Sequence, residues 1–214
     1  ASREIYFAAL DRLVKGEGGT ANVAQAAEQE ANQLAAVLDQ VIARAGEDAA
    51  QAALLLALPS EVALGDRHVP LDPGRVHVAH RSLRRALGHA LQSQWLELSE
   101  SLLATELQMD GVAMGRRQLR NLALEYLAAG DHPEAERIAV ELFELPLCMS
   151  EELGALRTLV HYQLPGAAQA LAQFEKRWKD EALVMDQWFS VQASAGGTDQ
   201  VERVRGLLQH PAFD

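Results

Sequence analysis

The chain has 214 residues and a formal net charge of −11 at pH 7, which disfavours nucleic acid and anionic membrane as partners. Its single cysteine, Cys148, excludes an internal disulfide framework and suits a reducing compartment, so we expect a cytoplasmic protein. No apolar run approaches the roughly 20 residues that span a bilayer, and charges interrupt the N-terminal apolar pattern, so neither a membrane span nor a signal peptide is predicted.

The first part of the chain predicts three amphipathic helices. Ala and Leu, both strong helix formers, are abundant, and no segment shows the alternating pattern of strands. The predicted helices end at the glycine-rich stretch 15–19, at Gly46 and before Pro59, because Gly and Pro interrupt helices. Their apolar stripes are Tyr6, Leu10 and Leu13, then Leu34, Leu38, Val41 and Ile42, and finally the run AALLLAL at 52–58.

A loop is predicted over residues 59–72, and a long helix follows it. Asp72 is the expected N-cap, with Pro73 at the first helical position. Leu71 and Val76 stand where a hydrophobic staple would place them. One apolar stripe then continues to the end of this helix, with a bend expected near Gly88; its members are Leu83, Leu87, Leu91, Leu98 and Leu102.

From Met114 onward the predicted helices come in pairs, which begin near residues 114, 150 and 182. This spacing is typical of helical-repeat solenoids, although the residue identities repeat poorly. Asp131 with Glu134 resembles a capping box, and Ser150 is the predicted N-cap of the next pair. The apolar stripes are Leu119, Leu122, Ala123, Tyr126 and Leu127, then Ile138 and Leu142, then Leu171, Phe174 and Trp178, and lastly Val201, Val204, Leu207 and Leu208.

These elements predict an all-α fold, a HEAT-like or armadillo-like right-handed superhelix of helix pairs. The whole chain, 1–214, is expected to be a single helical domain. Within it, N-terminal helices occupy 1–58, the loop 59–72, and helix pairs 73–214.

The histidines do not form a metal-binding motif. A helical metalloprotease site needs two His one turn apart with a Glu between them, as in H-E-x-x-H, and this spacing is absent. The stretch HPEAE at 132–136 has no second His. His77 and His80 are three residues apart on a helix, and His89 is too distant to complete a ligand set. The favoured interpretation of His77 and His80 is two partly exposed helix residues.

Other candidate side chains also fall short of a catalytic constellation. Cys148 has no recognisable His partner and is expected to be a small buried apolar group. Arg116, Arg117 and Arg120 could grip a carboxylate or phosphate, but in an acidic protein they are more often ion-pair partners. No glycine-rich phosphate loop occurs. We therefore predict no catalytic, cofactor-binding or metal-binding residue, and no cofactor, in this chain.

The stretch LVMDQWFSVQA, residues 183–193, concentrates aromatic residues in a chain that has few. Met185, Trp188, Phe189 and Gln192 follow helical spacing, and Trp178 is placed to pack against them from the preceding helix. Either a ligand platform or core packing would explain such a stripe. Aromatics at helical spacing are core far more often than they are ligand platforms, so we interpret this stripe as core.

Several stretches resemble the C-terminal helical domain of the bacterial-type aminopeptidase N family. They are GRRQLRNLALEYLAAG (115–130), FEKRWKDEALVMDQWFSVQA (174–193) and VERVRGLLQHPAF (201–213), with LALPSE (56–61) and VPLDPGRVHVAHRSLRRAL (69–87) matching the same domain in the same order. The resemblance covers residues 54–213 well and residues 1–50 only loosely.

The resemblance implies an accessory role. In that family a zinc-dependent catalytic domain, carrying H-E-x-x-H and a distant Glu, removes N-terminal amino acids from peptides. This chain lacks those motifs, so the resemblance carries over no catalytic residue and places the zinc in a longer parent enzyme. It implies a helical domain that walls the active-site chamber and limits access, with the catalytic domain of the same polypeptide as its partner and peptides as the parent's substrates.

Two further expectations concern the ends of the chain and the alternative class of protein. The chain has no initiator Met and stops before the family's domain does, so we expect a fragment of a longer protein. The apolar stripe of its last helix is then expected to support self-association through the C-terminal end. The alternative is a freestanding helical-repeat scaffold that binds partner peptides; an open reading frame with H-E-x-x-H upstream would exclude it.

Overall fold

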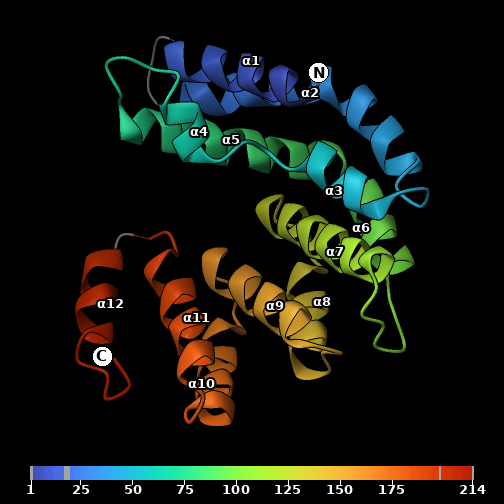
Figure 1. Ribbon diagram of the computed structural model, residues 1–214. Helices are drawn as coiled ribbons and strands as arrows, with labels where there is room; N and C mark the ends of the chain where they lie inside the picture. The colour runs from blue at the N-terminus through green and yellow to red at the C-terminus, as the bar shows by residue number, and fades with distance from the viewer. Residues whose placement is uncertain (1, 17–19, 198, 214) are drawn as a thin grey trace. The chain divides into compact units, whose positions relative to one another are not determined.

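The computed structural model describes residues 2–16, 20–197 and 199–213. Within these ranges the backbone forms twelve helices and no strand, which confirms the all-α prediction (Figure 1). The chain divides into two compact units: residues 1–104 with 108–132, and residues 105–107 with 133–214. The sequence predicted one domain whose helix pairs begin at 73. The helices of 73–132 instead fold with the N-terminal ones, because they pack directly against them.

The first unit contains seven helices in the described ranges. They are α1 (Ser2–Lys15), α2 (Thr20–Ala43), α3 (Ala49–Leu56), α4 (Glu61–Gly65), α5 (Pro73–Ala90), α6 (Gln92–Ser101) and α7 (Gly111–Ala129). The three predicted N-terminal helices are confirmed, and Tyr6, Leu10 and Leu38 of their stripes are buried. Residues 17–19 of the predicted glycine-rich break lie outside the described residues.

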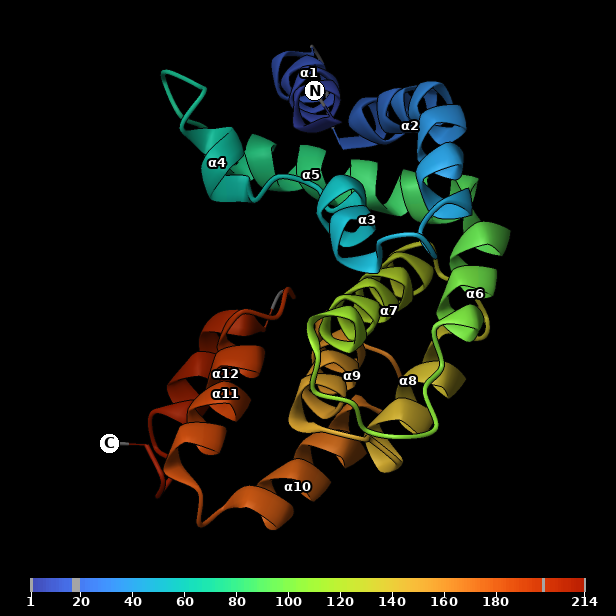
Figure 2. The same ribbon diagram turned by 45° about the vertical axis from the view of Figure 1, so that its right-hand side comes forward.

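Helix α7 is the centre of the first unit. It packs against α3, α5 and α6, while α2 lies along α5 (Figures 1 and 2). Its predicted stripe is buried at Leu119, Ala123 and Leu127. The ring of Tyr126 stacks on Trp95 of α6, with ring centroids 4.3 Å apart. This parallel stacking joins α6 to α7.

The segment 59–72 is not wholly a loop, as the sequence predicted, because it contains the short helix α4. Ser60 caps this helix: its Oγ accepts a hydrogen bond from the backbone N–H of Ala63 at 3.2 Å. Leu64 is completely buried and anchors the turn. A Ser before a short apolar stretch is an N-cap signal that the sequence interpretation passed over.

The start of α5 follows the prediction closely. Asp72 is the N-cap, its Oδ1 accepts the Arg75 N–H at 3.1 Å, and Pro73 occupies the first position. Only one of the two side chains of the expected hydrophobic staple is buried: Val76 is buried, whereas Leu71 remains 54% exposed.

The predicted long helix is two helices, which meet at Leu91 rather than bending at Gly88. Leu91 has φ −123 and ψ 28, outside the helical region, and Trp95 Nε1 donates to the Leu87 carbonyl across the break at 3.1 Å. Gly88 has a different role. A Cβ at this position would lie 2.4 Å from the Tyr126 carbonyl oxygen and 2.7 Å from the Gly130 nitrogen. Gly88 therefore permits the close approach of α5 to the end of α7.

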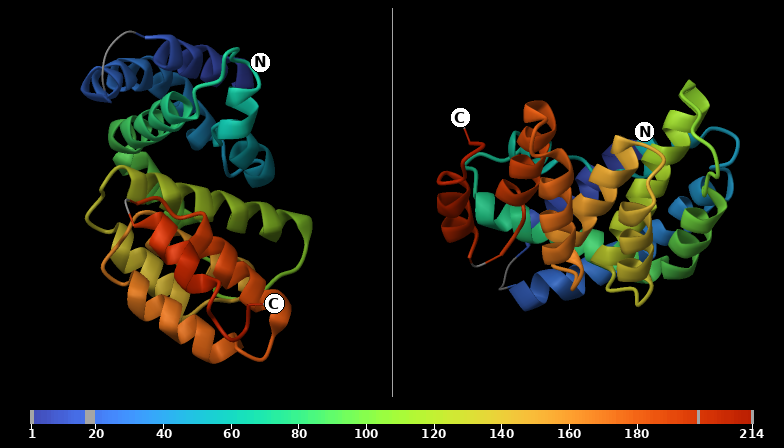
Figure 3. Two further views of the ribbon diagram at one scale, coloured as in Figure 1. Left: turned by 90° about the vertical axis from the view of Figure 1, so that its left-hand side faces the viewer. Right: turned by 90° about the horizontal axis from the view of Figure 1, so that it is seen from below.

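The second unit contains α8 (Ala135–Glu144), α9 (Met149–His161), α10 (Ala167–Trp178), α11 (Ala182–Ala193) and α12 (Gln200–Leu207). Helix α9 contacts α8, α10 and α11, and α12 lies beside α11 (Figures 1 and 3). The predicted starts near 114, 150 and 182 correspond to helices that begin at Gly111, Met149 and Ala182. The pairwise rhythm in the sequence therefore placed these helices correctly.

Two predicted caps are wrong. Asp131 has a positive φ of 53, and its carboxylate pairs with the Arg85 guanidinium at 2.6 Å. Glu134, not Asp131, occupies the N-cap of α8 and forms no side-chain cap bond. Helix α9 begins at Met149 after Cys148, so Ser150 lies inside the first turn. Ser and Asp also favour turns and first-turn positions, so composition alone fixes a cap only to within a residue or two.

No helix among the described residues is both long enough and apolar enough to cross a membrane.

Candidate functional site

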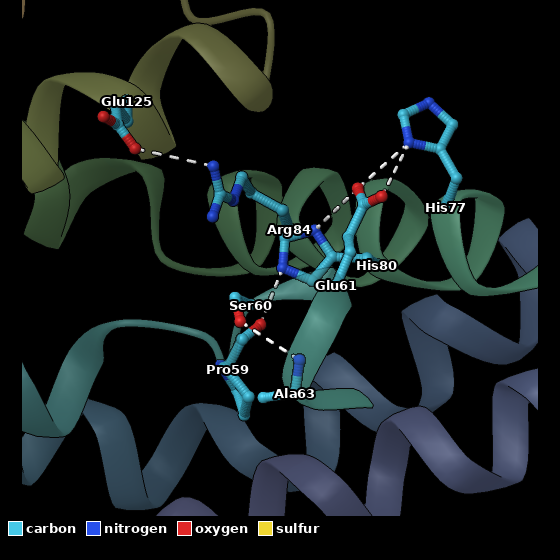
Figure 4. A network of polar contacts seen from close by, with 8 residues as sticks. All are labelled: Pro59, Ser60, Glu61, Ala63, His77, His80, Arg84 and Glu125. Atoms are coloured by element: carbon cyan, nitrogen blue, oxygen red, sulfur yellow. Dashed lines mark hydrogen bonds and ion pairs between the residues drawn. The ribbon is translucent and has the colours of Figure 1, made fainter. Parts of the chain in front are cut away.

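His77 and His80, the two neighbouring histidines that the sequence raised as candidates, both meet Glu61 in the structure, a residue that the sequence did not single out (Figure 4). Glu61 follows the Ser60 cap at the start of α4, and its carboxylate faces α5. His77 Nδ1 lies 3.0 and 3.2 Å from the two carboxylate oxygens, and His80 Nδ1 lies 3.6 Å from the nearer one. The spacing of three residues places both imidazoles on the same face of α5.

The two histidines occupy different environments. The His77 side chain is 47% exposed, whereas that of His80 is 9% exposed, so the prediction of two partly exposed residues is wrong for His80. His80 Nε2 donates a hydrogen bond to the Pro59 carbonyl at 3.0 Å. That carbonyl has no helical partner of its own, because it belongs to the connection between α3 and α4.

Burial, assisted by the positive charge of Arg84, lowers the pKa of His80 to about 4 from an ordinary value of 6.5. The imidazole is therefore neutral near pH 7, with its proton on the nitrogen that faces Pro59. Arg84 is itself directed toward Glu125 of α7 at 3.5 Å. This arrangement joins α4, α5 and α7 and is structural in character, since one ring nitrogen of His80 is already occupied.

Among the residues that the structure describes, no group of three or more His, Cys, Asp and Glu side chains is arranged to hold a metal ion. His89, on the same helix, lies 3.9 Å from the Asp131 carboxylate and far along α5 from His80. The prediction that this chain has no metal-binding, cofactor-binding or catalytic residue remains a prediction.

The three arginines of α7 do not act together. Arg116 is exposed, whereas Arg117 and Arg120 are buried. Arg117 Nη1 donates to the Gln108 carbonyl at 2.8 Å, so it fixes the segment before α7 rather than forming the ion pair that the sequence favoured. A guanidinium suits this position because its several donors can reach a backbone oxygen while its stem packs against apolar neighbours.

Cys148 is half-buried, not fully buried as expected. It occupies the N-cap of α9 in an extended conformation, with φ −160 and ψ 167. Its carbonyl oxygen accepts hydrogen bonds from the N–H groups of Glu151 at 3.0 Å and Glu152 at 3.2 Å. The backbone of Cys148 therefore begins the helix, and its thiol has no assigned role.

The aromatic stripe of α11 is core, as predicted. Met185, Trp188, Phe189 and Gln192 are all buried. Trp188 Nε1 donates to the Leu171 carbonyl at 3.0 Å, and its ring meets Phe189 edge-on at 5.1 Å. The ring of Trp178 lies 6.3 Å from that of Phe174, and its Nε1 donates to the Glu152 carboxylate at 3.2 and 3.3 Å.

The described part of the chain is all-helical, and in the second unit each helix packs against its neighbours in the sequence. A family model described as a domain of unknown function (DUF3458_C) with ARM repeats matches residues 1–214. The chain belongs to this family.

Curated relatives narrow the assignment further. Aminopeptidase N of Caulobacter vibrioides is 36% identical over 172 residues, which cover 78% of this chain and 20% of the relative. Aminopeptidase N of Escherichia coli (strain K12) is 31% identical over 179 residues, covering 84% and 20%. The chain thus spans about a fifth of the curated relatives that it matches. The predicted resemblance to the C-terminal helical domain of aminopeptidase N is confirmed.

A solved structure supports the fold alone. The chain aligns with Legionella pneumophila aminopeptidase A, in a crystal structure with aspartic acid, at a TM-score of 0.73 and 23% identity. The alignment covers 96% of this chain and 27% of that one. Both kinds of comparison therefore relate this chain to one part of larger proteins.

Proposed function

We propose that this chain is the C-terminal accessory domain of a zinc-dependent aminopeptidase N, an enzyme that removes N-terminal amino acids from peptides. Its role is to wall the chamber around the active site, so that peptides enter and folded proteins do not. Its partners are the catalytic domain of the same polypeptide and, in the parent enzyme, the peptide substrates. The chain has no catalysis of its own.

One observation carries the proposal: the ARM-repeat family model covers residues 1–214, while the aminopeptidase N relatives extend far beyond the region that they share with this chain. Chains of packed helix pairs suit a wall, since each pair contacts its neighbours and presents an extended surface. The parent's zinc would be bound outside this chain, because the described residues bring no three suitable ligands together.

The proposal includes a cytoplasmic location. Cys148 is the only cysteine of the chain and is half-buried as a free thiol. A protein that does not use disulfides for stability suits a reducing compartment.

The first test uses the longer parent protein. We expect it to hydrolyse aminoacyl-arylamides and to lose this activity when a chelator removes its metal. We also expect the 214-residue chain alone to be inactive and to contain no stoichiometric metal. A parent without chelator-sensitive aminopeptidase activity would contradict the enzymatic assignment.

The second test addresses the wall. The intact parent and a form lacking residues 1–214 of this chain are compared on an aminoacyl-arylamide, a ten-residue peptide and a folded protein with the same N-terminal residue. If this chain limits access, the shortened form should gain cleavage of the folded protein. Metal content and arylamide activity serve as controls for a folded catalytic part. A shortened form that keeps both and still rejects the folded protein overturns the role as a wall.

A further inference from the structure

A hollow of about 620 Å³ opens between α2 and α5 of the first unit. We call it the α2–α5 groove. One wall is the stripe of Ala24, Glu28 and Asn32, which are four residues apart and so share one face of α2. The other wall is a stripe of α5 that includes Ser82, Arg85 and His89. Its volume lies in the range of small-molecule sites, about 300–1,000 Å³.

The space exists because small side chains line the groove where the two helices approach. Ala24 on α2, with Ala86 and Ala90 on α5, contribute only methyl groups. Ala86 is buried, so it forms part of the floor, whereas Ala24 and Ala90 are exposed at the sides. The groove therefore combines a shallow apolar floor with polar walls.

The polar groups on the walls are available to a ligand. Within the described ranges of the chain, Glu28, Asn32 and Ser82 form no hydrogen bond or ion pair with another residue. Arg85 pairs with Asp131 at 2.6 Å, but the two side chains are 64% and 62% exposed, and such a pair is weak in water. The His89 side chain is half exposed, 3.9 Å from the same carboxylate.

The charges on the two walls have opposite sign. The α2 wall presents the Glu28 carboxylate, and the α5 wall presents the Arg85 guanidinium beside the His89 imidazole. A polyanion would be repelled by the carboxylates of Glu28 and Asp131 and by the net charge of −11, so phosphate-rich ligands are disfavoured. A ligand with one positive and one negative end matches both walls.

The length of the groove limits the size of such a ligand. Ala24 and Asn32 are eight residues apart, which corresponds to about 12 Å along α2. An extended peptide advances about 3.4 Å per residue, so about three residues fit this length. Asn32, one turn after Glu28, and Ser82, one turn before Arg85, can donate to and accept from the peptide groups of such a ligand.

We propose that the α2–α5 groove binds a short peptide with free termini. Glu28 accepts hydrogen bonds from its α-ammonium group, and Arg85, sharing its guanidinium with Asp131, donates to its α-carboxylate. The binding belongs to this chain alone and does not depend on the proposed aminopeptidase role, so the two proposals fail separately.

The test titrates the 214-residue chain with trialanine and follows saturable binding by calorimetry and by NMR chemical shifts. N-acetyl-trialanine amide, which lacks both charges, should bind at least about tenfold more weakly, because each charged end loses its partner. Free alanine distinguishes a peptide from a single amino acid, and it should also bind at least about tenfold more weakly, because it offers no peptide groups to Asn32 and Ser82.

Variants assign the binding to the groove. Glu28→Gln and Arg85→Gln should each weaken trialanine binding about tenfold, since each removes one charge-assisted contact. Arg81→Gln, one turn earlier on α5, and Glu4→Gln on α1 are matched controls at exposed positions outside the groove and should leave binding unchanged. Circular dichroism checks that all four variants remain folded.

Four results would overturn the proposal. They are the absence of saturable trialanine binding at millimolar concentration, equal binding of the blocked peptide, equal binding of free alanine, and equal loss of binding in the groove variants and their controls.

Discussion

In the first unit two buried tyrosine hydroxyls share one carbonyl acceptor, whereas the second unit buries two adjacent glutamates. The hydroxyls of Tyr126 and Tyr6 both donate to the Leu56 carbonyl, at 2.8 and 3.4 Å. Glu151 and Glu152, at the start of α9, are each 2% exposed. These two buried polar groups therefore find their partners by different chemistry.

Helix ends explain the difference. Leu56 is the last residue of α3, and the carbonyl at a helix C-terminus has no partner within the helix. Burial, together with the neighbouring Tyr126, raises the pKa of Tyr6, so its hydroxyl stays protonated and able to donate. In the first unit, neutral donors thus complete a helix C-terminus inside the core.

In the second unit, charged acceptors lie at a helix N-terminus instead. Glu151 accepts the Leu147 N–H at 2.9 Å, and Glu152 accepts from Arg177 at 2.6 Å and from Trp178. Negative charge is favourable in the first turn of a helix, because the unpaired N–H groups point toward it. The position of α10 on α9 consequently depends on a charged contact.

The largest expected effect compares the two buried tryptophans. Trp95→Ala in the first unit and Trp188→Ala in the second should each lower the free energy of unfolding by about 3–5 kcal/mol, because each removes a large buried ring and one hydrogen bond. Denaturant unfolding measures both. A melting temperature of Trp188→Ala within about 2 °C of the parent chain would contradict the assignment of Trp188 to the core.

The next largest effect is the pH dependence of stability that His80 causes in the first unit. Because the folded pKa of His80, about 4, lies below the ordinary 6.5, the unfolded chain binds the proton more tightly between these values. Stability should therefore fall as pH decreases from 6.5 to 4, by about 3 kcal/mol at most, and the contribution is fully present above pH 6.5. The measurement is unfolding at several pH values for the parent chain and His80→Gln. Since Gln retains a donor for Pro59 but does not titrate, an equal pH dependence in both proteins would refute the assignment.

A smaller effect tests the charged contact of the second unit. Glu152→Gln should cost about 2 kcal/mol, because Arg177 and Trp178 lose a charged acceptor while a neutral one remains. Glu141→Gln is the matched control: its pair with Arg137 is exposed, so the change should stay below about 0.5 kcal/mol. Chemical unfolding of both variants gives the comparison, and equal costs would mean that burial does not distinguish the two pairs.

The smallest expected effect on stability concerns the last helix. Val201, Leu208 and Phe213 are 63%, 50% and 47% exposed, so apolar surface faces solvent at this end of the second unit. We predict that the chain self-associates there at high concentration. Leu208→Glu should weaken the association while changing stability by less than about 0.5 kcal/mol. Sedimentation over a concentration series decides the matter, and a monomer at every concentration would exclude this association.

Local signals predicted the parts of the structure that depend on nearby residues. The Asp72–Pro73 helix start, the buried stripe of α11 and the pairwise starts of α7, α9 and α11 all follow from patterns within a few residues. Helical periodicity and capping chemistry act over one or two turns, so a single sequence contains them.

The features that the sequence missed depend on residues far apart in the chain. Nothing near His80 shows that Pro59 needs a donor, and nothing near Gly88 shows that α7 ends against it. The α2–α5 groove escaped notice for the same reason, since Glu28 and Arg85 stand on helices separated by two others. Long-range packing brings these groups together, so their interactions can be recognised only in the tertiary structure.

The sequence by itself determined an all-helical chain, the approximate places of most of its helices, its family resemblance and the core role of Trp188, because composition, periodicity and motif order can be read from the sequence alone. Only the tertiary structure decided that α5 and α6 are separate helices, that His80 is buried and neutral, and that residues 73–132 fold with the N-terminal helices. These outcomes depend on which surfaces meet, and the free energy of burying a group is set by the neighbours that the fold supplies.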